Sequence, residues 1–174
     1  MRKGGGMAKS RVGIVGLGIM GSAMAANLIK AGFKVVGHDP VPACRARHRK
    51  AGGILAENAS DLAASVNVIV TSLPSAKALL DFAGQLARTK RTRQIVIETS
   101  TLPIPVKEAA RRKLAAAGIT LLDCPLSGTG AQARVKDLIV YGSGDAAAFK
   151  RTVPVLRASR AAITTSASSA TARK

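Results

Sequence analysis

Aromatic residues are almost absent from this sequence. Tryptophan does not occur, and Phe and Tyr make up only 2% of the 174 residues, whereas 47% of the residues are hydrophobic. A core must therefore be built from Val, Ile, Leu and Ala, which suits parallel strands covered on both faces by helices. A chain of this length can bury about 70% of its unfolded surface as one domain, and it is short for two.

Cysteine is also scarce. Cys44 and Cys124 stand far apart, without a Cys-x-x-Cys pair or a histidine spacing that would suggest a metal site. Reduced thiols in a cytoplasmic protein are the expected state. The two histidines, His38 and His48, are interpreted as bystanders, and the sequence predicts no metal site.

Acidic residues are few, so that 27 Lys and Arg stand against 9 Asp and Glu and the formal net charge is +18. Three basic clusters, at 45–50, 88–93 and 111–113, could serve a nucleic-acid surface. They fall on different expected elements, however, and no aromatic residues lie among them to stack on bases. We interpret them mainly as solvated faces that attract anions, and predict no specific nucleic-acid partner.

Long apolar runs that no glycine interrupts are lacking as well. The uncharged stretch from Val12 to Ile29 follows a basic N-terminus, so it could be a signal sequence, a membrane span or a nucleotide site. Its glycines would weaken a membrane helix, and no cleavage pattern follows it. We therefore expect a nucleotide site and no membrane association.

Strand-like and helix-like segments alternate from Arg11 onward. The expected strands are 11–15, 33–38, 54–56, 66–73, 94–99, 119–123 and 138–141, and the expected helices are 19–31, 42–51, a short one after Ser60, 75–86, 103–117 and 146–157. This order predicts an α/β fold, a Rossmann-type doubly wound and mainly parallel sheet, over residues 11–157. Residues 1–10 are expected to be a flexible N-terminus, and the Ala/Ser/Thr-rich residues 158–174 a disordered tail.

The motif Gly16-Leu17-Gly18-Ile19-Met20-Gly21 follows an expected strand and opens an expected helix, as a dinucleotide-binding turn does. Gly16 permits the tight turn, Gly18 lets a pyrophosphate approach the backbone, and Gly21 lets the helix pack closely on the strand. The N-terminus of the helix supplies N–H groups to the phosphates. All six residues are therefore predicted to bind the cofactor.

Asp39 ends the second expected strand, where its carboxylate can accept hydrogen bonds from the adenosine ribose hydroxyls. The same charge would repel a 2′-phosphate, which favours NAD over NADP. Arg45, Arg47 and Arg49 begin nearby on the next helix, and one of them could instead bind a 2′-phosphate. The predicted cofactor is therefore NAD(P), with NAD slightly favoured.

The segment 16–32 resembles the start of the β-hydroxyacid dehydrogenase family, which contains 3-hydroxyisobutyrate dehydrogenase, tartronate semialdehyde reductase and, more distantly, 6-phosphogluconate dehydrogenase. Three later stretches resemble family motifs in the same order: VIVTSLPS at 68–75, IETSTLP at 97–103 and DCPLSGTGAQA at 123–133. The resemblance covers roughly residues 11–157. It implies that Leu73 and Pro74 line the adenosine side of the cofactor, with Ser100 and Thr101 near the nicotinamide ribose.

The same resemblance implies that Ser127 and Gly128 offer a hydroxyl and an N–H to the carboxylate of a small hydroxy-acid substrate. Thr129 stands where the family usually has a second glycine, and its bulk and hydroxyl could alter the preferred acid. Cys124 replaces an alanine, but it has no basic neighbour to lower its pKa, so it is not proposed as a nucleophile.

The family's catalytic lysine belongs to a Gly-x-x-Gly-x-Gly-x-x-x-Lys motif in a helical domain, and nothing after Arg157 resembles that motif. Lys136 is interpreted as an ordinary exposed lysine, so the catalytic residue is left unassigned. The expected function is the NAD(P)-binding domain of a hydroxy-acid dehydrogenase, in a truncated form with little activity alone. Two alternatives stay open: the active half of a split enzyme completed by a helical partner, and a non-enzymatic nucleotide- or nucleic-acid-binding module. The expected protein partner is a helical domain or a second copy of the chain.

Overall fold

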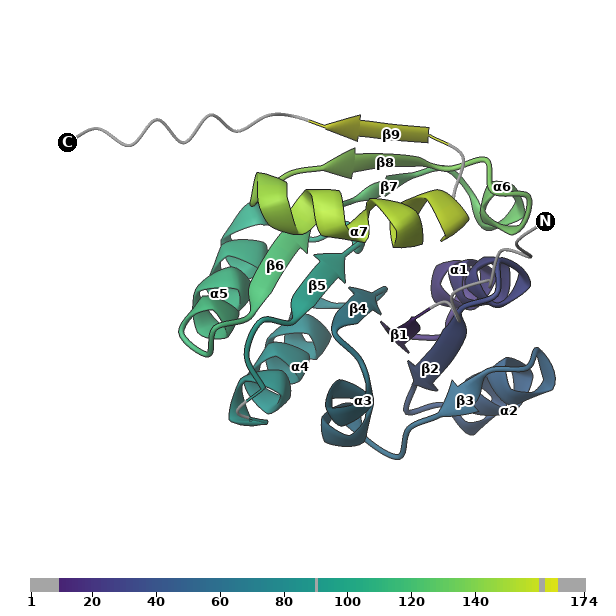
Figure 1. The fold of residues 1–174 in the computed structure, drawn as a ribbon, viewed down its shortest axis with the longest axis horizontal. Coiled ribbons are helices and arrows are strands. Elements are labelled where there is room, and N and C mark those ends of the chain that lie inside the picture. Colours follow the sequence, from purple (N-terminus) through teal and green to yellow (C-terminus); the bar gives the residue numbers. More distant parts are fainter. Residues whose placement is uncertain (1–9, 90, 160–161, 166–174) are drawn as a thin grey trace, which may run out of the picture.

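The computed structural model describes residues 10–89, 91–159 and 162–165, and its centre is a six-stranded parallel sheet of order β3-β2-β1-β4-β5-β6 (Figure 1). The strands are β1 (Arg11–Val15), β2 (Lys34–His38), β3 (Ile54–Leu55), β4 (Val68–Thr71), β5 (Ile95–Glu98) and β6 (Thr120–Asp123). They alternate with α1 (Ile19–Lys30), α2 (Pro42–Lys50), α3 (Ala59–Ser65), α4 (Ala76–Arg88) and α5 (Ile104–Ala115). The predicted doubly wound α/β fold is confirmed.

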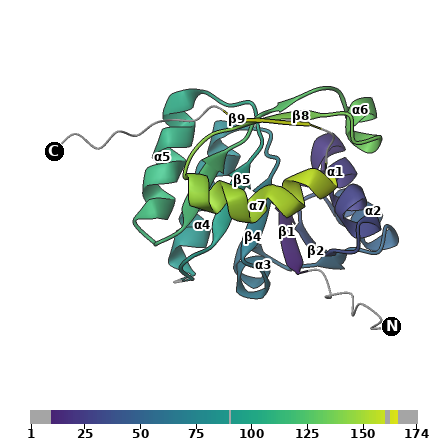
Figure 2. The same ribbon diagram turned by 45° about the horizontal axis from the view of Figure 1, so that its top comes forward.

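Two apolar layers cover the two faces of this sheet. One contains Leu62 of α3, Leu79 and Phe82 of α4 and Leu114 of α5. The other contains side chains of α1 and of α7 (Ala146–Ser159), which crosses the sheet in Figure 2. Both layers consist almost entirely of aliphatic side chains, as the low aromatic content predicts, and this is the packing that strands buried on both faces require.

A second, three-stranded sheet extends the fold beyond β6. In it, β7 (Leu126–Ser127) pairs antiparallel with β8 (Ile139–Gly142), and β8 pairs parallel with β9 (Ala162–Thr165). A short helix, α6 (Gly130–Arg134), connects β7 to β8. The sequence did not predict β7 or α6, because each is shorter than the window in which hydrophobic periodicity can be recognised, and β9 was also not predicted.

The prediction of a disordered tail from residue 158 onward is wrong for its first part. Helix α7 continues to Ser159, and β9 pairs with β8 through the backbone, which a composition argument does not consider. The residues 1–9 and 166–174, on which the remaining terminal predictions fall, lie outside the described residues. Within the described part of the chain, no helix has both the length and the hydropathy needed to cross a membrane.

Candidate functional site

The site begins at the carboxyl edge of the parallel sheet, where β1 lies between β2 and β4. Successive strands are added to one side of β1 and then to the other, so the loops after β1 and β4 diverge at this point. In open parallel sheets, ligands bind at such a switch point. The glycine motif is the loop that leaves β1 here.

Gly16 makes the turn out of β1. Its φ is +90°, and an added Cβ would collide with the backbone carbonyl of Ser72, in the loop after β4. A Cβ at Gly21 would likewise collide with the carbonyl of Gly16. The first and third glycines of the motif are therefore required by the fold, through positive φ and close backbone packing.

Gly18 differs from these two glycines, because a Cβ placed on it would meet no atom within 4 Å. It is the N-cap of α1, and no side chain caps that end of the helix. The first turn of α1 contains no acidic residue. An uncapped helix N-terminus with open space before it has N–H groups and a partial positive charge available for an anion.

Asp39 lies at the end of β2, is 7% exposed and anchors the glycine loop. One carboxylate oxygen accepts the Leu17 N–H at 2.7 Å, and the other accepts the Val41 N–H at 2.8 Å. The sequence prediction assigned this carboxylate to the ribose hydroxyls. Two backbone bonds already use part of its acceptor capacity, but a carboxylate has about four acceptor positions, so the ribose role stays a prediction.

Arg45 is the basic residue of α2 that is held close to Asp39. Its guanidinium donates to the backbone carbonyls of Asp39, at 2.8 Å, and Pro40, at 2.9 Å. Arg47, by contrast, donates to the sulfur of Cys44. Arg45 therefore borders the position where the adenosine ribose would lie if Asp39 binds it.

The loops after β4 and β5 are joined by Ser100. Its hydroxyl accepts the Leu73 N–H at 2.8 Å, and its own N–H donates to the Glu98 carboxylate at 2.9 Å. Ser100 is buried, whereas Pro74 and Thr101 are exposed at the surface of these loops. The structure thus gives Ser100 a positioning role and leaves Pro74 and Thr101 free to contact a ligand.

Behind these loops lies a buried ionic cluster that the sequence did not predict. The ammonium group of Lys107, on α5, lies 2.5 Å from an Asp123 oxygen and 3.2 Å from Glu98 Oε2. The side chains of Lys107 and Glu98 are 7% and 0% exposed, and that of Asp123 is 36% exposed. The cluster ties the carboxyl ends of β5 and β6 to α5, and these two strands lead into the Ser100 loop and the predicted substrate loop.

The predicted substrate loop runs from β7 into α6. Ser127 and Gly128 are exposed, and Gly128 has a φ of +135°. Thr129 caps α6: its hydroxyl accepts the Gln132 N–H, and the Gln132 side chain accepts the Thr129 N–H at 2.9 Å. The Thr129 hydroxyl also donates to Gln132 Oε1 at 3.1 Å, so both its donor and its acceptor are engaged in the capping box.

Contacts between α1 and α6 bring the substrate loop to the glycine motif. The amide of Asn27, buried in α1, donates to the Ala133 carbonyl of α6 at 2.8 Å. Ile19, at the start of α1, lies so close to Gly130 that a Cβ there would collide with it. Asn27 is thus a positioning residue that the sequence analysis missed, since a single polar residue on the buried face of a helix gives no indication of its partner.

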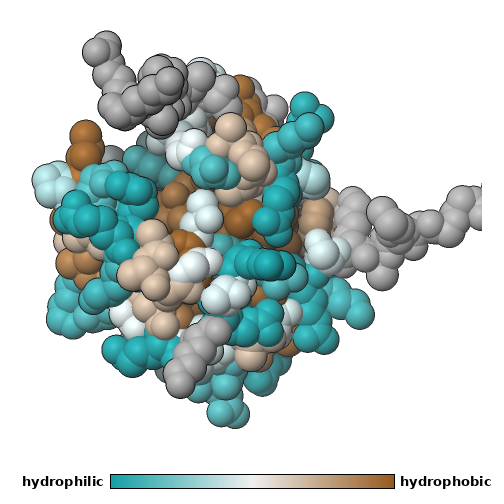
Figure 3. Space-filling model, turned by 60° about the vertical axis from the view of Figure 1, so that its left-hand side comes forward, coloured by the Kyte–Doolittle hydropathy of each residue, from teal (hydrophilic) through white to brown (hydrophobic). Residues whose placement is uncertain are grey.

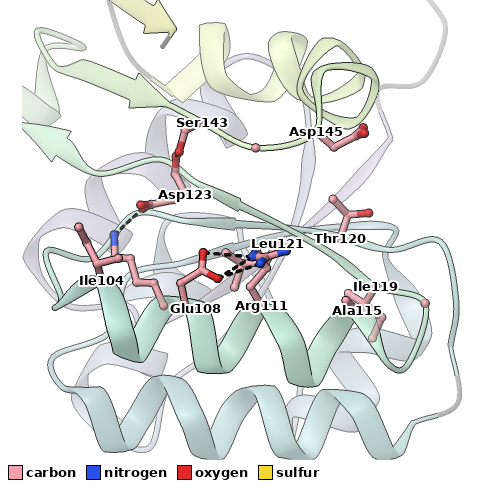
Figure 4. Close-up of a pocket in the computed structure, with 13 residues that line it drawn as sticks. Ile104, Glu108, Arg111, Ala115, Ile119, Thr120, Leu121, Asp123, Ser143 and Asp145 are labelled. Atoms are coloured by element: carbon pink, nitrogen blue, oxygen red, sulfur yellow. Dashed lines mark hydrogen bonds and ion pairs between the residues drawn. The ribbon is translucent and has the colours of Figure 1, made fainter. Parts of the chain in front are cut away.

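A cavity of about 740 Å³ lies on the other side of the ionic cluster, between α5, β6 and the loop that precedes α7 (Figure 4). Figure 4 shows Asp123 and Ser143 on one side of it and the ion-paired Glu108 and Arg111 on another. None of the predicted cofactor-binding residues lines this cavity. This cavity is therefore separate from the predicted cofactor site.

Burial shifts the pKa of two side chains that the sequence analysis considered. Cys124 is fully buried, and burial raises the pKa of its thiol to about 12, with a smaller contribution from the Asp123 charge. The opposing effect of Lys107, a basic neighbour that the sequence did not reveal, is smaller than these. Burial also lowers the pKa of His48, which lies against the backbone of β2. Among the described residues, no cluster of three or more His, Cys, Asp or Glu side chains is arranged to hold a metal ion.

The model of the family described as the NAD binding domain of 6-phosphogluconate dehydrogenase matches residues 11–167. The chain therefore belongs to this family of NAD(P)-binding domains, which the β-hydroxyacid dehydrogenases share. The predicted family and cofactor class are thereby confirmed, whereas the individual site residues stay predictions.

Among curated relatives, an L-threonate dehydrogenase of Cupriavidus necator is 33% identical over 150 residues, covering 84% of this chain and 50% of its own length. A mitochondrial 3-hydroxyisobutyrate dehydrogenase of Rattus norvegicus is 31% identical, over 78% of this chain and 42% of its own. A solved 3-hydroxyisobutyrate dehydrogenase of Mycobacterium tuberculosis is 27% identical with a TM-score of 0.87, over 90% of this chain and 54% of its own. The chain spans about half the length of the curated relatives it matches.

Proposed function

We propose that the chain binds NAD(P) at the carboxyl edge, with the pyrophosphate against Gly16, Leu17 and Gly18. The observation that carries this proposal is the uncapped N-terminus of α1, which has no atom within 4 Å of the position of a Gly18 Cβ. Ile19, Met20 and Gly21 contribute the backbone N–H groups of the first helical turn. The adenosine half lies toward Asp39, and the nicotinamide half toward Thr101.

Substitution of Gly18 should affect cofactor binding, whereas substitution of Gly16 should affect stability, and this difference provides the test. Gly18→Val places its side chain in the open space, so the protein should fold with nearly unchanged stability but lose at least about tenfold in NADH affinity, because that space is where the pyrophosphate lies. Gly16→Ala is the contrasting variant, since its Cβ collides with the Ser72 carbonyl and stability should fall. Calorimetric titration with NADH and urea unfolding would be measured for both. Unchanged NADH affinity in folded Gly18→Val would refute the site.

We propose further that NAD is bound more tightly than NADP. The buried Asp39 carboxylate would repel a 2′-phosphate, and the Arg45 guanidinium is held by two backbone carbonyls. Asp39→Asn should narrow the ratio of NADPH to NADH dissociation constants, and Arg45→Gln should leave this ratio within about twofold. If Arg45→Gln selectively weakens the binding of NADPH, the guanidinium binds the 2′-phosphate, and the proposed preference for NAD is contradicted.

The chemistry we propose for the complete site is hydride transfer between a small hydroxy acid and the nicotinamide. Support comes from the activities for which the relatives are named and from the close approach of Gly130, at the start of α6, to Ile19 of the glycine motif. Ser127 and Gly128 would hold the carboxylate, with Thr129 setting the shape of the loop. NADH formation from L-threonate and 3-hydroxyisobutyrate, compared between the chain and its Ser127→Ala variant in the presence of a relative's helical domain, would test the assignment. Equal rates would exclude Ser127 from substrate binding.

A further inference from the structure

Basic residues gather along the amino edge of the parallel sheet, opposite the proposed cofactor site. In this fold every helix that follows a strand runs back toward the amino edge, so the C-termini of α1, α2, α4 and α5 all meet the starts of the strands there. The basic clusters that are separate in sequence are therefore brought together by the topology. We call this surface the basic edge and define it by two groups of residues.

The first group consists of Lys30, Lys34, Arg49 and Lys50, all exposed. Lys34 begins β2, and Lys30 ends α1. The end of α2 contacts the end of α1, since a Cβ on Gly52 would lie 3.8 Å from the Ile29 side chain. The four cations are therefore neighbours around the starts of β1 and β2.

The second group consists of Arg88, Arg91, Arg93, Arg112 and Lys113, also exposed. The Arg93 N–H donates to the carbonyl of Gly118 at 2.8 Å, which fastens the loop before β5 to the turn after α5. Arg88 lies in the last turn of α4, and Arg112 and Lys113 lie in the last turn of α5. This side of the molecule faces the reader in Figure 3, where hydrophilic side chains (teal) surround smaller apolar patches (brown).

The basic edge lacks compensating charge. Among the described residues, the ion pairs are Lys77–Asp81, Arg111–Glu108 and the Lys107 cluster, and no cation of the basic edge takes part in them. The 9 acidic residues of the chain all lie in the described part, and none of them is in the last turn of a helix or at the start of a parallel strand. Helix dipoles favour cations at helix C-termini, but they give no reason for Lys34, which begins a strand. The clustered cations therefore create a positive potential along this edge.

We propose that the basic edge binds the phosphate backbone of duplex nucleic acid without sequence preference. The neighbouring strand starts are about 4.8 Å apart, so cations spread across the edge from β2 to β6 extend over roughly 20 Å, about the width of a duplex. No aromatic side chain is exposed there among the described residues, which disfavours single strands, because their tight binding uses base stacking. Of the large hydrophobic side chains that are exposed in the described part of the chain, Ile54 alone begins a strand of the six-stranded sheet, so an extended apolar surface for a bilayer is not found at this edge.

The test uses the full 174-residue chain and the triple variant Lys50→Gln, Arg112→Gln, Lys113→Gln, which removes cations from both groups. Fluorescence anisotropy of a short random-sequence DNA duplex would be measured from about 50 to 200 mM salt. Each lost phosphate contact should reduce the slope of log K against log salt by about 0.9. The slope measured for the triple variant should therefore be smaller in magnitude than that of the unmodified chain by about 2 to 3, and its affinity for the duplex should be at least about tenfold lower.

A matched control removes the same charge elsewhere. Lys150, Arg151 and Arg157 are exposed on α7, which crosses a face of the sheet instead of ending at the basic edge (Figure 2). Their triple Gln variant should keep the slope of the unmodified chain within about 1. Equal losses in the two variants would show that net charge alone attracts DNA, and would overturn the proposal.

Three further outcomes would also overturn it: no duplex binding by the unmodified chain, tighter binding of a single strand than of the duplex, or binding of vesicles with an anionic lipid headgroup in place of the duplex. The proposal does not depend on the cofactor site, which lies at the opposite edge. Saturating NADH should change the duplex dissociation constant by less than about twofold. A chain that binds the duplex but not NADH would refute the proposed function and leave this surface supported.

Discussion

The buried ionic cluster at Lys107 allows a quantitative prediction. Lys107→Met removes the ammonium group but keeps a side chain of similar length. The variant leaves Glu98, which is fully buried, and Asp123, which is partly exposed, without their cation. Removing one partner of a buried ion pair leaves an uncompensated buried charge, and this is the costly change.

The expected cost follows from the burial of the two carboxylates. Breaking a buried pair costs about 3–5 kcal/mol, and the lower end applies here because solvent reaches the 36%-exposed Asp123 side chain. We therefore expect a loss of about 3 kcal/mol in the free energy of unfolding. At about 2–4 °C per kcal/mol for a domain of this size, the melting temperature should fall by roughly 6–12 °C.

Urea unfolding would measure the change, with Lys77→Met as control. Lys77 also pairs with a carboxylate, but its side chain is 85% exposed, so its substitution should change stability by less than about 0.5 kcal/mol. The double variant Glu98→Gln, Lys107→Met should recover at least about half of the loss, because it removes the fully buried charge. A loss below about 1 kcal/mol for Lys107→Met, or no recovery in the double variant, would show that the cluster does not stabilise the fold in this way.

Three further predictions concern titration and turnover. Because burial raises the pKa of Cys124 to about 12, a thiol reagent at about pH 8 should modify Cys44 and leave Cys124 unmodified until the protein unfolds. Mass spectrometry of the peptides would measure the modification, and modified Cys124 in the folded protein would contradict this prediction. The pKa of His48 is lowered in the folded state, so as the pH falls the His48 side chain is protonated at a higher pH in the unfolded state than in the folded state. Stability should therefore decrease below about pH 6.5, and His48→Gln should lessen that decrease in urea titrations at successive pH values. The 174-residue chain assayed alone should show negligible NADH formation from hydroxy acids. General acid–base catalysis contributes about 10²–10⁴ in rate, and the family's lysine motif does not occur in the sequence of this chain. Rapid turnover would mean that another of these residues supplies the catalytic group, and Lys136 would be substituted first.

The parallel sheet could be predicted from the sequence because its causes are local. Glycines at 16, 18 and 21 between an apolar strand and a helix have one common structural context, and the regular alternation of segments leaves few topologies. The capping box of α6 was not predicted, although Thr129 and Gln132 stand three residues apart, because so short a helix has no apolar period that would confirm it.

The buried polar residues could not be predicted, because their partners are distant in sequence. Asn27 would be an unfavourable residue in the core without the Ala133 carbonyl, and Lys107 would be one without Glu98 and Asp123. Asp39 was recognised, but its backbone partners were not, since the Leu17 N–H points to it only after the glycine turn has formed. The sequence therefore does not identify the distant group to which each buried polar side chain is bonded.

The same strand polarity that places the proposed cofactor site at the carboxyl edge also accounts for the basic edge. Helix N-termini converge on the carboxyl edge, where α1 has neither a side-chain cap nor an acidic residue in its first turn, so its backbone N–H groups are available for the anion that we propose there. Helix C-termini converge on the amino edge, where Lys and Arg in the last turns are stabilised by the helix dipoles and also gather at one edge. Under the two proposals, one edge attracts anions by backbone N–H groups, whose effect is confined to a turn of helix, and the other by side-chain charge, whose effect reaches about a Debye length. Added salt should accordingly weaken duplex binding steeply while NADH binding falls much less.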